Sequence, residues 1–256
     1  MSRLSSLPTA LQQAIRQGRA LKVIAGLDNF DAARVQQVVR AAAAGGADLV
    51  DLACAPALVR LAHHLAPHLP ICVSAVDPAL FPPAVAAGTA MVEIGNYDSF
   101  YPQGRVFGAA EVLALTRRTR ELLPETVLSV TVPHTLPLDA QERLAVELVA
   151  AGADLIQTEG GTGARPLSAG ALGLIEKAAP TLAAAYAISR AVAVPVLCAS
   201  GLSAVTVPMA LAAGAAGVGV GSAVNRLDDE LAMVAVVRAL REALPVAAVV
   251  HGERPQ

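Results

Sequence analysis

Short apolar runs alternate with helical patterns along the whole chain of 256 residues. Eight runs have strand length and are rich in Val, Ile and Leu: 21–26, 49–53, 71–75, 91–96, 126–132, 154–160, 195–201 and 217–222. Between them lie stretches with amphipathic helical spacing, such as 31–46 and 138–152. This alternation is typical of a parallel sheet whose strands are joined by crossover helices.

The number of units narrows the fold class. Eight strand–helix units without a linker predict an α/β protein with one closed (β/α)8 TIM barrel, a single domain over residues 1–256. A doubly wound open sheet is the alternative, but its glycine-rich fingerprint would follow the first strand, and residues 25–30 lack it. Residues 1–17 predict a short amphipathic N-terminal helix that could close the bottom of the barrel.

Residue type also alternates within the strands. Branched apolar residues occupy one parity, as at Val50, Val92 and Val218, and should face the helices. Polar or small residues occupy the other parity and should point into the barrel: Lys22, Asp51, Ser74, Glu93, Thr131, Gln157, Glu159, Gly217, Gly219 and Gly221. Charged groups are therefore expected inside the barrel.

Residues 195–225 predict a phosphate pocket. Barrels of this kind commonly bind phosphate with the loops after the seventh and eighth strands. Glycines there let backbone N–H groups approach an anion, and a helix beginning near Ser222 would add its positive N-terminal end. Because neither lysine lies nearby in sequence, backbone groups and the Ser222 hydroxyl should provide most of the binding. The predicted phosphate-binding residues are Ser200, Gly201, Gly219, Gly221 and Ser222.

Four residues are the catalytic candidates: Lys22, Glu93, His134 and Glu159. Lys22 could form a Schiff base, or it could be a structural ion pair with Asp51 or Glu93, which its early place in the strand favours. Glu159 ends its strand before a glycine-rich loop, where barrel enzymes place active residues, although infill of the barrel interior is the alternative for both glutamates. His134 is the one histidine at a strand end, and imidazole suits acid–base chemistry.

Further polar residues at strand ends are expected to line the same pocket: Asp51, Asn96 and Gln157. No HxH or His–carboxylate spacing indicates a metal site, so none is predicted. No cofactor is predicted either. FMN is a minor alternative, because its phosphate would use the same corner.

The segment 95–110 holds four of the seven aromatic residues of the chain, at Tyr97, Phe100, Tyr101 and Phe107. Three interpretations share this evidence. The segment could be a lid or pocket wall, a small core that folds the loop onto the barrel rim, or an oligomer interface.

Composition narrows the partners. A net charge of −2 without a basic stripe argues against nucleic acid. No uninterrupted apolar run approaches the ~20 residues of a membrane span, and no signal peptide pattern opens the chain. Cys54, Cys72 and Cys198 lie in apolar runs, which indicates buried reduced thiols. The expectation is a soluble cytoplasmic protein.

Several motifs carry a family resemblance: LKVIAGLDNF, ICVSAVDP, EIGNYDSFY, VTVPHTL, LIQTEG, AYAISR and VPVLCASGLSAVTVPMALAAGAAGVGVGSAVN. From about Leu21 to Arg226 the chain closely resembles the "hypothetical chloroplast open reading frame twenty-three" proteins of plastids and cyanobacteria. The resemblance implies an aldolase-type TIM barrel, and location in the plastid stroma for a source with plastids. It supplies no reaction.

The leading functional hypothesis is an enzyme that acts on a small phosphorylated metabolite by aldolase, lyase or isomerase chemistry. The alternatives are a barrel that binds a metabolite for regulation without turnover, and a structural or assembly factor. Any of them is compatible with a homo-oligomer. The fold class does not separate them, since TIM barrels carry many unrelated activities.

Overall fold

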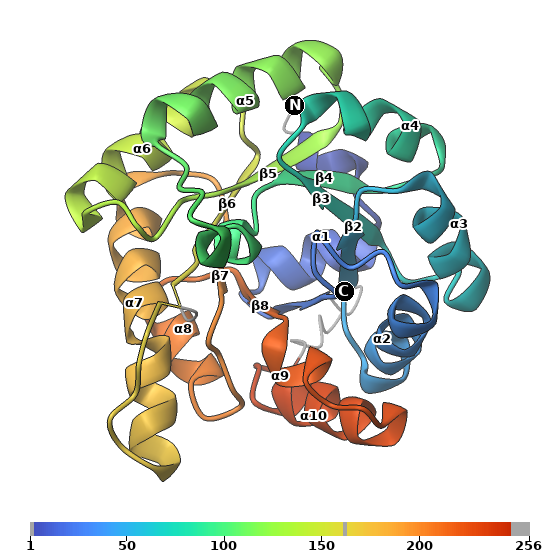
Figure 1. Ribbon diagram of the computed structural model, residues 1–256, viewed down its shortest axis with the longest axis vertical. Coiled ribbons are helices and arrows are strands. Elements are labelled where there is room, and N and C mark those ends of the chain that lie inside the picture. The colour runs from blue at the N-terminus through green and yellow to red at the C-terminus, as the bar shows by residue number, and fades with distance from the viewer. Residues whose placement is uncertain (1–2, 161–162, 247–256) are drawn as a thin grey trace, which may run out of the picture.

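The computed structural model describes residues 3–160 and 163–246, and within them eight parallel strands close into a barrel (Figure 1). Each strand pairs with the next along the chain, and β1 pairs with β8. The predicted (β/α)8 TIM barrel is confirmed, while both ends of the expected single domain lie outside the described residues. The strands are β1 Ala20–Ile24, β2 Leu49–Ala53, β3 Ile71–Ala75, β4 Met91–Ile94, β5 Val127–Thr131, β6 Leu155–Gln157, β7 Val196–Ala199 and β8 Gly217–Val220.

Helices surround the barrel and follow the strands in chain order (Figure 1). The α-helices are α1 Thr9–Arg16, α2 Ala32–Gly45, α3 Pro56–Leu65, α4 Phe81–Ala86, α5 Ala109–Leu122, α6 Leu138–Ala150, α7 Gly170–Ala191, α8 Val207–Ala212, α9 Ser222–Asn225 and α10 Glu230–Glu242. Short 3-10 helices are η1 Arg3–Ser6, η2 Pro78–Leu80, η3 Tyr97–Ser99 and η4 Tyr101–Gln103.

The predicted parity of the strands is confirmed. Val50, Val92 and Val218 are fully buried in the core that joins the strands to the surrounding helices. Lys22 and Glu93 are equally buried but point the other way, since their side chains meet inside the barrel. Branched apolar residues on one parity therefore pack against the helices, and polar residues on the other parity fill the interior of the barrel.

The N-terminal helix closes the bottom of the barrel, as the sequence predicts. Its apolar residues Leu11, Ala14 and Ile15 pack in one cluster with the first interior layer of the strands. That layer consists of Ala20, Leu49, Cys72, Met91, Val127, Leu155 and Leu197. This end of the barrel is therefore filled with apolar side chains, and the polar interior begins one layer above.

The strands end earlier than the sequence pattern indicates, because glycine-rich turns begin at their carboxyl ends. Ser200 and Gly201 both have φ near +75° (75° and 76°), so the backbone leaves β7 after Ala199. Gly160 has φ of 144°, beyond the end of β6 at Gln157. These turns form the loops at the top of the barrel, where the candidate site lies.

Helix α7 is long and apolar enough to span a membrane by length and composition alone. It packs against β7, α6 and α8 as one of the helices around the barrel, while Leu172, Leu174 and Tyr186 on it remain exposed. All three cysteines are buried and free, as expected from their positions in apolar runs.

Candidate active site

A cavity of about 510 Å³ opens at the carboxyl ends of β1, β4, β7 and β8. This volume is in the range of small-molecule sites, and this end of the barrel is where TIM-barrel enzymes carry their active sites. A second cavity, of about 610 Å³, lies at the opposite end beside α1. Among the described residues that line it there is no His, Asp, Glu or Lys, so the first cavity is the candidate site.

One wall of this cavity is made by the turns after β7 and β8. Ser200 and Gly201 come from the first turn, and Gly221 and Ser222 from the second. A Cβ at Gly221 would lie 3.4 Å from the carbonyl oxygen of Ile24, so the residue has room for a small side chain. The structure thus brings four of the five predicted phosphate-binding residues to one wall of the cavity.

Gly219 is the exception. It lies within β8, paired with Lys22 and Ala199, and does not line the cavity. A Cβ at this position would come within 2.9 Å of the Ala199 Cβ and 3.1 Å of the Ile24 Cδ1. Glycine is therefore required here by packing inside the barrel, and the predicted anion contact of Gly219 has no support from the cavity's lining.

The helix expected after Gly221 is also smaller than predicted. Helix α9 has four residues, Ser222–Asn225, so it is a single turn with a small dipole. Arg34 holds its end, because the guanidinium donates to the carbonyl oxygens of Asn225 and Leu227. Ser222 and Ala223 at the start of this turn line the cavity, and the helix is too short to add a large dipole.

Two cationic residues line the same cavity, contrary to the expectation that no lysine is near. Lys177 reaches it from α7, and Arg226 follows α9. Within the described residues neither side chain has an acidic partner at ion-pairing distance. Sequence reasoning missed Lys177 because a residue in the third turn of a helix between two strands carries no pattern that relates it to the loops at the top of the barrel.

A buried polar network fills the barrel directly below this cavity. The Lys22 Nζ lies 2.7 Å from Glu93 Oε2 and 3.7 Å from Asp51 Oδ2. Gln157 Nε2 donates to Glu93 Oε1 at 2.7 Å, and Ser74 Oγ donates to Asp51 Oδ1 at 2.7 Å. The ion pair of Lys22 with Asp51 and Glu93 that the sequence favoured is present.

The electrostatics of this network hold Lys22 as a cation. Burial by itself lowers the pKa of Lys22, but the charges of Glu93 and Asp51 outweigh it and raise the pKa above its usual value. Burial raises the pKa of Glu93, and the charge of Lys22 opposes that rise. Lys22 is fully buried and does not line the cavity, so a Schiff base at this lysine has no geometric support.

Asn96 connects the network to the cavity. It lines the cavity, while its Nδ2 donates to Asp51 Oδ2 at 3.0 Å and to Glu93 Oε1 at 3.3 Å. Its backbone has φ of 63°, a left-handed conformation that Asn tolerates better than most residues. Of the pocket residues predicted from sequence, Asn96 therefore reaches the cavity, and Asp51 and Gln157 support it from below.

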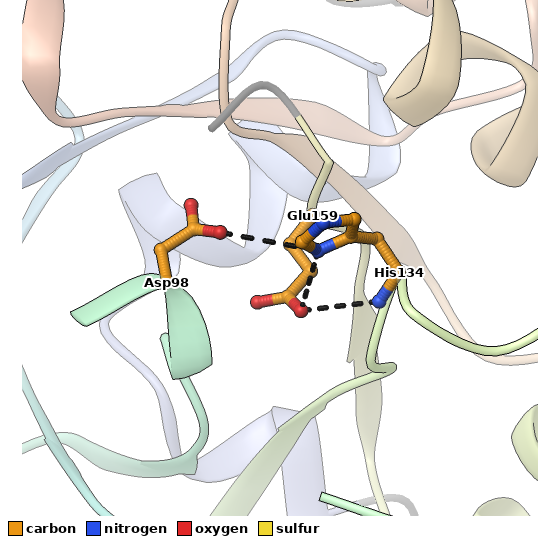
Figure 2. Close-up of side chains that lie close together, drawn as sticks. All are labelled: Asp98, His134 and Glu159. Carbon is orange, nitrogen blue, oxygen red and sulfur yellow. Dashed lines mark hydrogen bonds and ion pairs between the residues drawn. The ribbon is translucent and has the colours of Figure 1, made fainter. Parts of the chain in front are cut away.

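A second polar cluster stands beside the cavity, at Asp98, His134 and Glu159 (Figure 2). The three side chains come from η3 and from the loops that follow β5 and β6. His134 Nδ1 lies 3.0 Å from Glu159 Oε1 and 4.0 Å from Asp98 Oδ1. Both predicted catalytic residues of the loops, His134 and Glu159, are thus in direct contact, and Asp98 joins them to the cavity wall.

The Glu159 carboxylate is almost completely buried, with 3% of the side chain exposed. Its Oε1 accepts hydrogen bonds from the Tyr101 hydroxyl and from the backbone N–H of His134. Burial raises the pKa of Glu159, and the hydrogen bond with Glu159 raises the pKa of His134. The contact between the two groups therefore favours a proton held between them.

This cluster corrects the argument against a metal site. The absence of a metal-type spacing along the chain is real, but three loops bring one imidazole and two carboxylates within 4.8 Å of one another. Spacing within one element cannot reveal ligands that come from three separate loops. The geometry leaves room for a metal ion that the sequence argument excluded.

The aromatic segment has two of the three roles considered. Tyr97 and Phe107 are fully buried and stack with ring centroids 4.5 Å apart, and Phe100 packs edge-on against Phe107 at 5.3 Å. Tyr101 packs edge-on against His134 at 4.9 Å. The segment is therefore a small core on the barrel rim that also presents a wall of the site.

Solved structures of similar fold are TIM-barrel enzymes. A 3-hexulose-6-phosphate synthase matches with a TM-score of 0.61 at 18% identity, over 88% of this chain and 100% of that one. A thiamine phosphate pyrophosphorylase from Pyrococcus furiosus matches with 0.57 at 18% identity, over 90% and 96%. A geranylgeranylglyceryl phosphate synthase from Thermoplasma acidophilum, in complex with sn-glycerol-1-phosphate, matches with 0.60 at 12% identity, over 93% and 99%. At these identities the likeness establishes the aldolase-type barrel fold alone.

Sequence relatives are closer and carry the family. The protein named ycf23 of Cyanophora paradoxa is 46% identical over 189 residues, 74% of this chain and 77% of that protein. The ycf23 protein of Pyropia yezoensis is 37% identical over 226 residues, 88% and 82% of the two chains. The family model described as "Protein of unknown function (DUF561)" matches residues 5–250. The chain belongs to this family, together with the ycf23 proteins, as the motif resemblance predicts.

Proposed function

We propose that this protein is an enzyme that acts on a small phosphorylated metabolite, with lyase, aldolase or isomerase chemistry. The observation that carries the proposal is the division of one cavity into two walls. The turns with Gly201 and Gly221 line one wall, which would bind the anion. Asn96 and Asp98 line the other wall, and Asp98 is in the cluster with His134 and Glu159. A ligand of metabolite size could contact both walls at once.

The phosphate would bind between the turns after β7 and β8. Backbone N–H groups near Gly201 and Ser222 can approach an anion closely, since glycine and serine leave the approach open. The Ser200 and Ser222 hydroxyls add further donors, and Lys177 and Arg226 add positive charge at the cavity wall. Charge-assisted hydrogen bonds of this kind are the stronger ones in protein sites.

The reacting part of the ligand would lie toward Asp98, with His134 and Glu159 behind it. Two of these residues, His134 and Glu159, are catalytic candidates from the sequence, and Asp98 is added to them by the structure. Lys22 and Glu93 are fully buried below the cavity and act on the site through Asn96. The chemistry would therefore proceed without a Schiff base at Lys22.

The neighbouring folds support a phosphorylated ligand. Three of them are named for phosphate compounds, and one was solved with sn-glycerol-1-phosphate bound. Phosphate recognition by the loops after the last two strands is a common feature of this fold. The proposed enzyme is not a membrane protein and needs neither nucleic acid nor FMN. It could form homo-oligomers, and it would be located in the plastid stroma or in the cytoplasm, depending on the source.

The test is ligand binding to a pair of variants with the same change of charge. Gly221→Asp places a carboxylate in the proposed phosphate site, while a Cβ there meets no atom closer than 3.4 Å. Gly108→Asp is the control, because a Cβ at Gly108 has no atom within 4 Å and the residue does not line the cavity. Calorimetry with inorganic phosphate, and thermal shifts with a panel of sugar phosphates and triose phosphates, give the affinities.

We expect wild type and Gly108→Asp to bind equally, and Gly221→Asp to lose measurable binding. If both variants bind phosphate equally well, the anion binds elsewhere, and the turns after β7 and β8 have a packing role only. Binding of a phosphorylated ligand without any conversion of the panel would instead favour the regulatory barrel. Absence of binding in wild type would favour the structural or assembly factor.

A further inference from the structure

We propose that Asp98, His134 and Glu159 form a binding site for one divalent transition-metal ion at the edge of the cavity. Each residue offers one ligand atom, and these atoms lie within 4.8 Å of one another. Figure 2 shows both carboxylates directed at the imidazole ring. The inference rests on the proposed function only for the role of the ion in a reaction, because binding itself can be measured without any substrate.

The separations suit a common ion with a small adjustment. Ligand atoms bound to one ion at about 2.1 Å lie about 3.0–3.4 Å apart in octahedral or tetrahedral geometry. His134 Nδ1 and Glu159 Oε1 are already 3.0 Å apart, and His134 Nδ1 and Asp98 Oδ1 are 4.0 Å apart. All three ligand atoms lie within 4.8 Å of one another, so a shift of the Asp98 side chain toward the other two would complete the set.

An independent observation at Glu159 favours a cation at this cluster. The side chain is 3% exposed, and its Oε2 has no hydrogen-bond partner among the described residues. Throughout residues 3–160 and 163–246, no lysine or arginine lies within ion-pairing distance of Glu159. A buried carboxylate normally has its charge paired or bound to a metal, and here His134 is the one ion-pair partner.

Neighbouring groups hold the three ligands in orientation. The Tyr101 hydroxyl and the His134 backbone N–H both donate to Glu159 Oε1, and Oε2 of the same carboxylate has no hydrogen-bond partner among the described residues. The carboxylate would therefore bind the ion through Oε2 or through both oxygens. Ser200 Oγ donates to Asp98 Oδ2 at 3.0 Å. Hydrogen bonds of this kind orient metal ligands and are a regular part of built metal sites.

The donor set indicates the class of ion. One imidazole nitrogen with carboxylate oxygens suits Mn²⁺, Fe²⁺, Co²⁺ or Zn²⁺. Three protein ligands leave at least one coordination position for water or for a ligand oxygen, as in catalytic sites. Because Asp98 lines the cavity, that open position would face the bound metabolite and could polarise its carbonyl group.

The experiment titrates metal-free, full-length protein with Co²⁺, and follows the visible absorption of the bound ion together with calorimetry. Asp98→Asn and His134→Ala each remove one ligand. Asp228→Asn is the matched control, since the Asp228 carboxylate is fully exposed and lies outside both the cluster and the cavity. Circular dichroism of each variant without metal verifies that it folds.

We expect one Co²⁺ per wild-type chain, binding at least tenfold weaker in Asp98→Asn and in His134→Ala, and unchanged binding in Asp228→Asn. Absence of saturable binding at millimolar Co²⁺, or equal binding in all four proteins, would overturn the proposal. If His134→Ala does not fold, Asp98→Asn decides the outcome, because Asn keeps the size of Asp98.

Phosphate binding, measured without metal, separates this proposal from the proposed function. Gly221→Asp should lose phosphate and keep Co²⁺. If wild type binds phosphate but not Co²⁺, only the metal-site proposal is rejected. If it binds Co²⁺ but not phosphate, only the proposed function is rejected.

Discussion

Ser200 Oγ donates a 3.0 Å hydrogen bond to Asp98 Oδ2, between residues 102 positions apart in the chain. Ser200 belongs to the turn that would hold phosphate, and Asp98 belongs to the cluster with His134 and Glu159. The bond therefore joins the two parts of the candidate site. It depends on a backbone conformation that serine rarely adopts, with φ of 75° at Ser200.

This strain predicts a difference between two small substitutions at Ser200. Alanine and glycine both remove the hydroxyl, but only glycine relieves the left-handed backbone. Ser200→Gly should therefore be more stable than Ser200→Ala by about 1 kcal/mol in urea denaturation. Both variants should bind phosphate more weakly than wild type. Equal stability of the two variants would show that the left-handed conformation is absent in solution.

The two lysines should have separable roles. Lys22→Met leaves Glu93 and Asp51 buried without their counter-charge, and should lower the free energy of unfolding by about 3–5 kcal/mol. Lys177→Met should change stability by less than about 0.5 kcal/mol, because the side chain is partly exposed and has no ion pair in the described structure.

Phosphate affinity tests the proposed role of Lys177 in binding. Lys177→Met should weaken phosphate binding about tenfold, the usual effect of losing one charge-assisted hydrogen bond. A stable Lys22→Met protein would contradict the ion-pair account. A mass increase at Lys22 after borohydride treatment with a carbonyl substrate would restore the Schiff-base hypothesis.

Gly219 should behave as a packing residue. Gly219→Ala forces a Cβ to within 2.9 Å of the Ala199 Cβ, and should destabilise the barrel by about 1–3 kcal/mol. Its phosphate affinity at a temperature where it is folded should equal that of wild type. Loss of affinity without loss of stability would mean that Gly219 contacts the anion after all.

The fold was predictable because it depends on patterns that repeat. The alternation of strands and helices gave the barrel, and parity within the strands placed Val92 outside and Glu93 inside. The same parity predicted the ion pair of Lys22, since a charge in the interior requires a partner. These inferences needed only neighbouring residues and the geometry of a closed parallel barrel.

The site was predictable in part only. Asp98, His134 and Glu159 come from three loops, and no periodicity relates positions in separate loops. Lys177 lies inside helix α7, and no sequence pattern relates that position to the turns after β7 and β8. Gly219 and Gly221 have the same residue type and parity, and only the packing around Gly219 separates them.

The central claim is that a phosphate group binds between the turns after β7 and β8, and a crystal structure with phosphate or a phosphorylated metabolite tests it most directly. We predict electron density for the phosphate within hydrogen-bonding distance of backbone N–H groups near Gly201 and Ser222, with the Lys177 Nζ beside it. Density for the ligand at another place, with this corner of the cavity empty at saturating concentration, would contradict the account.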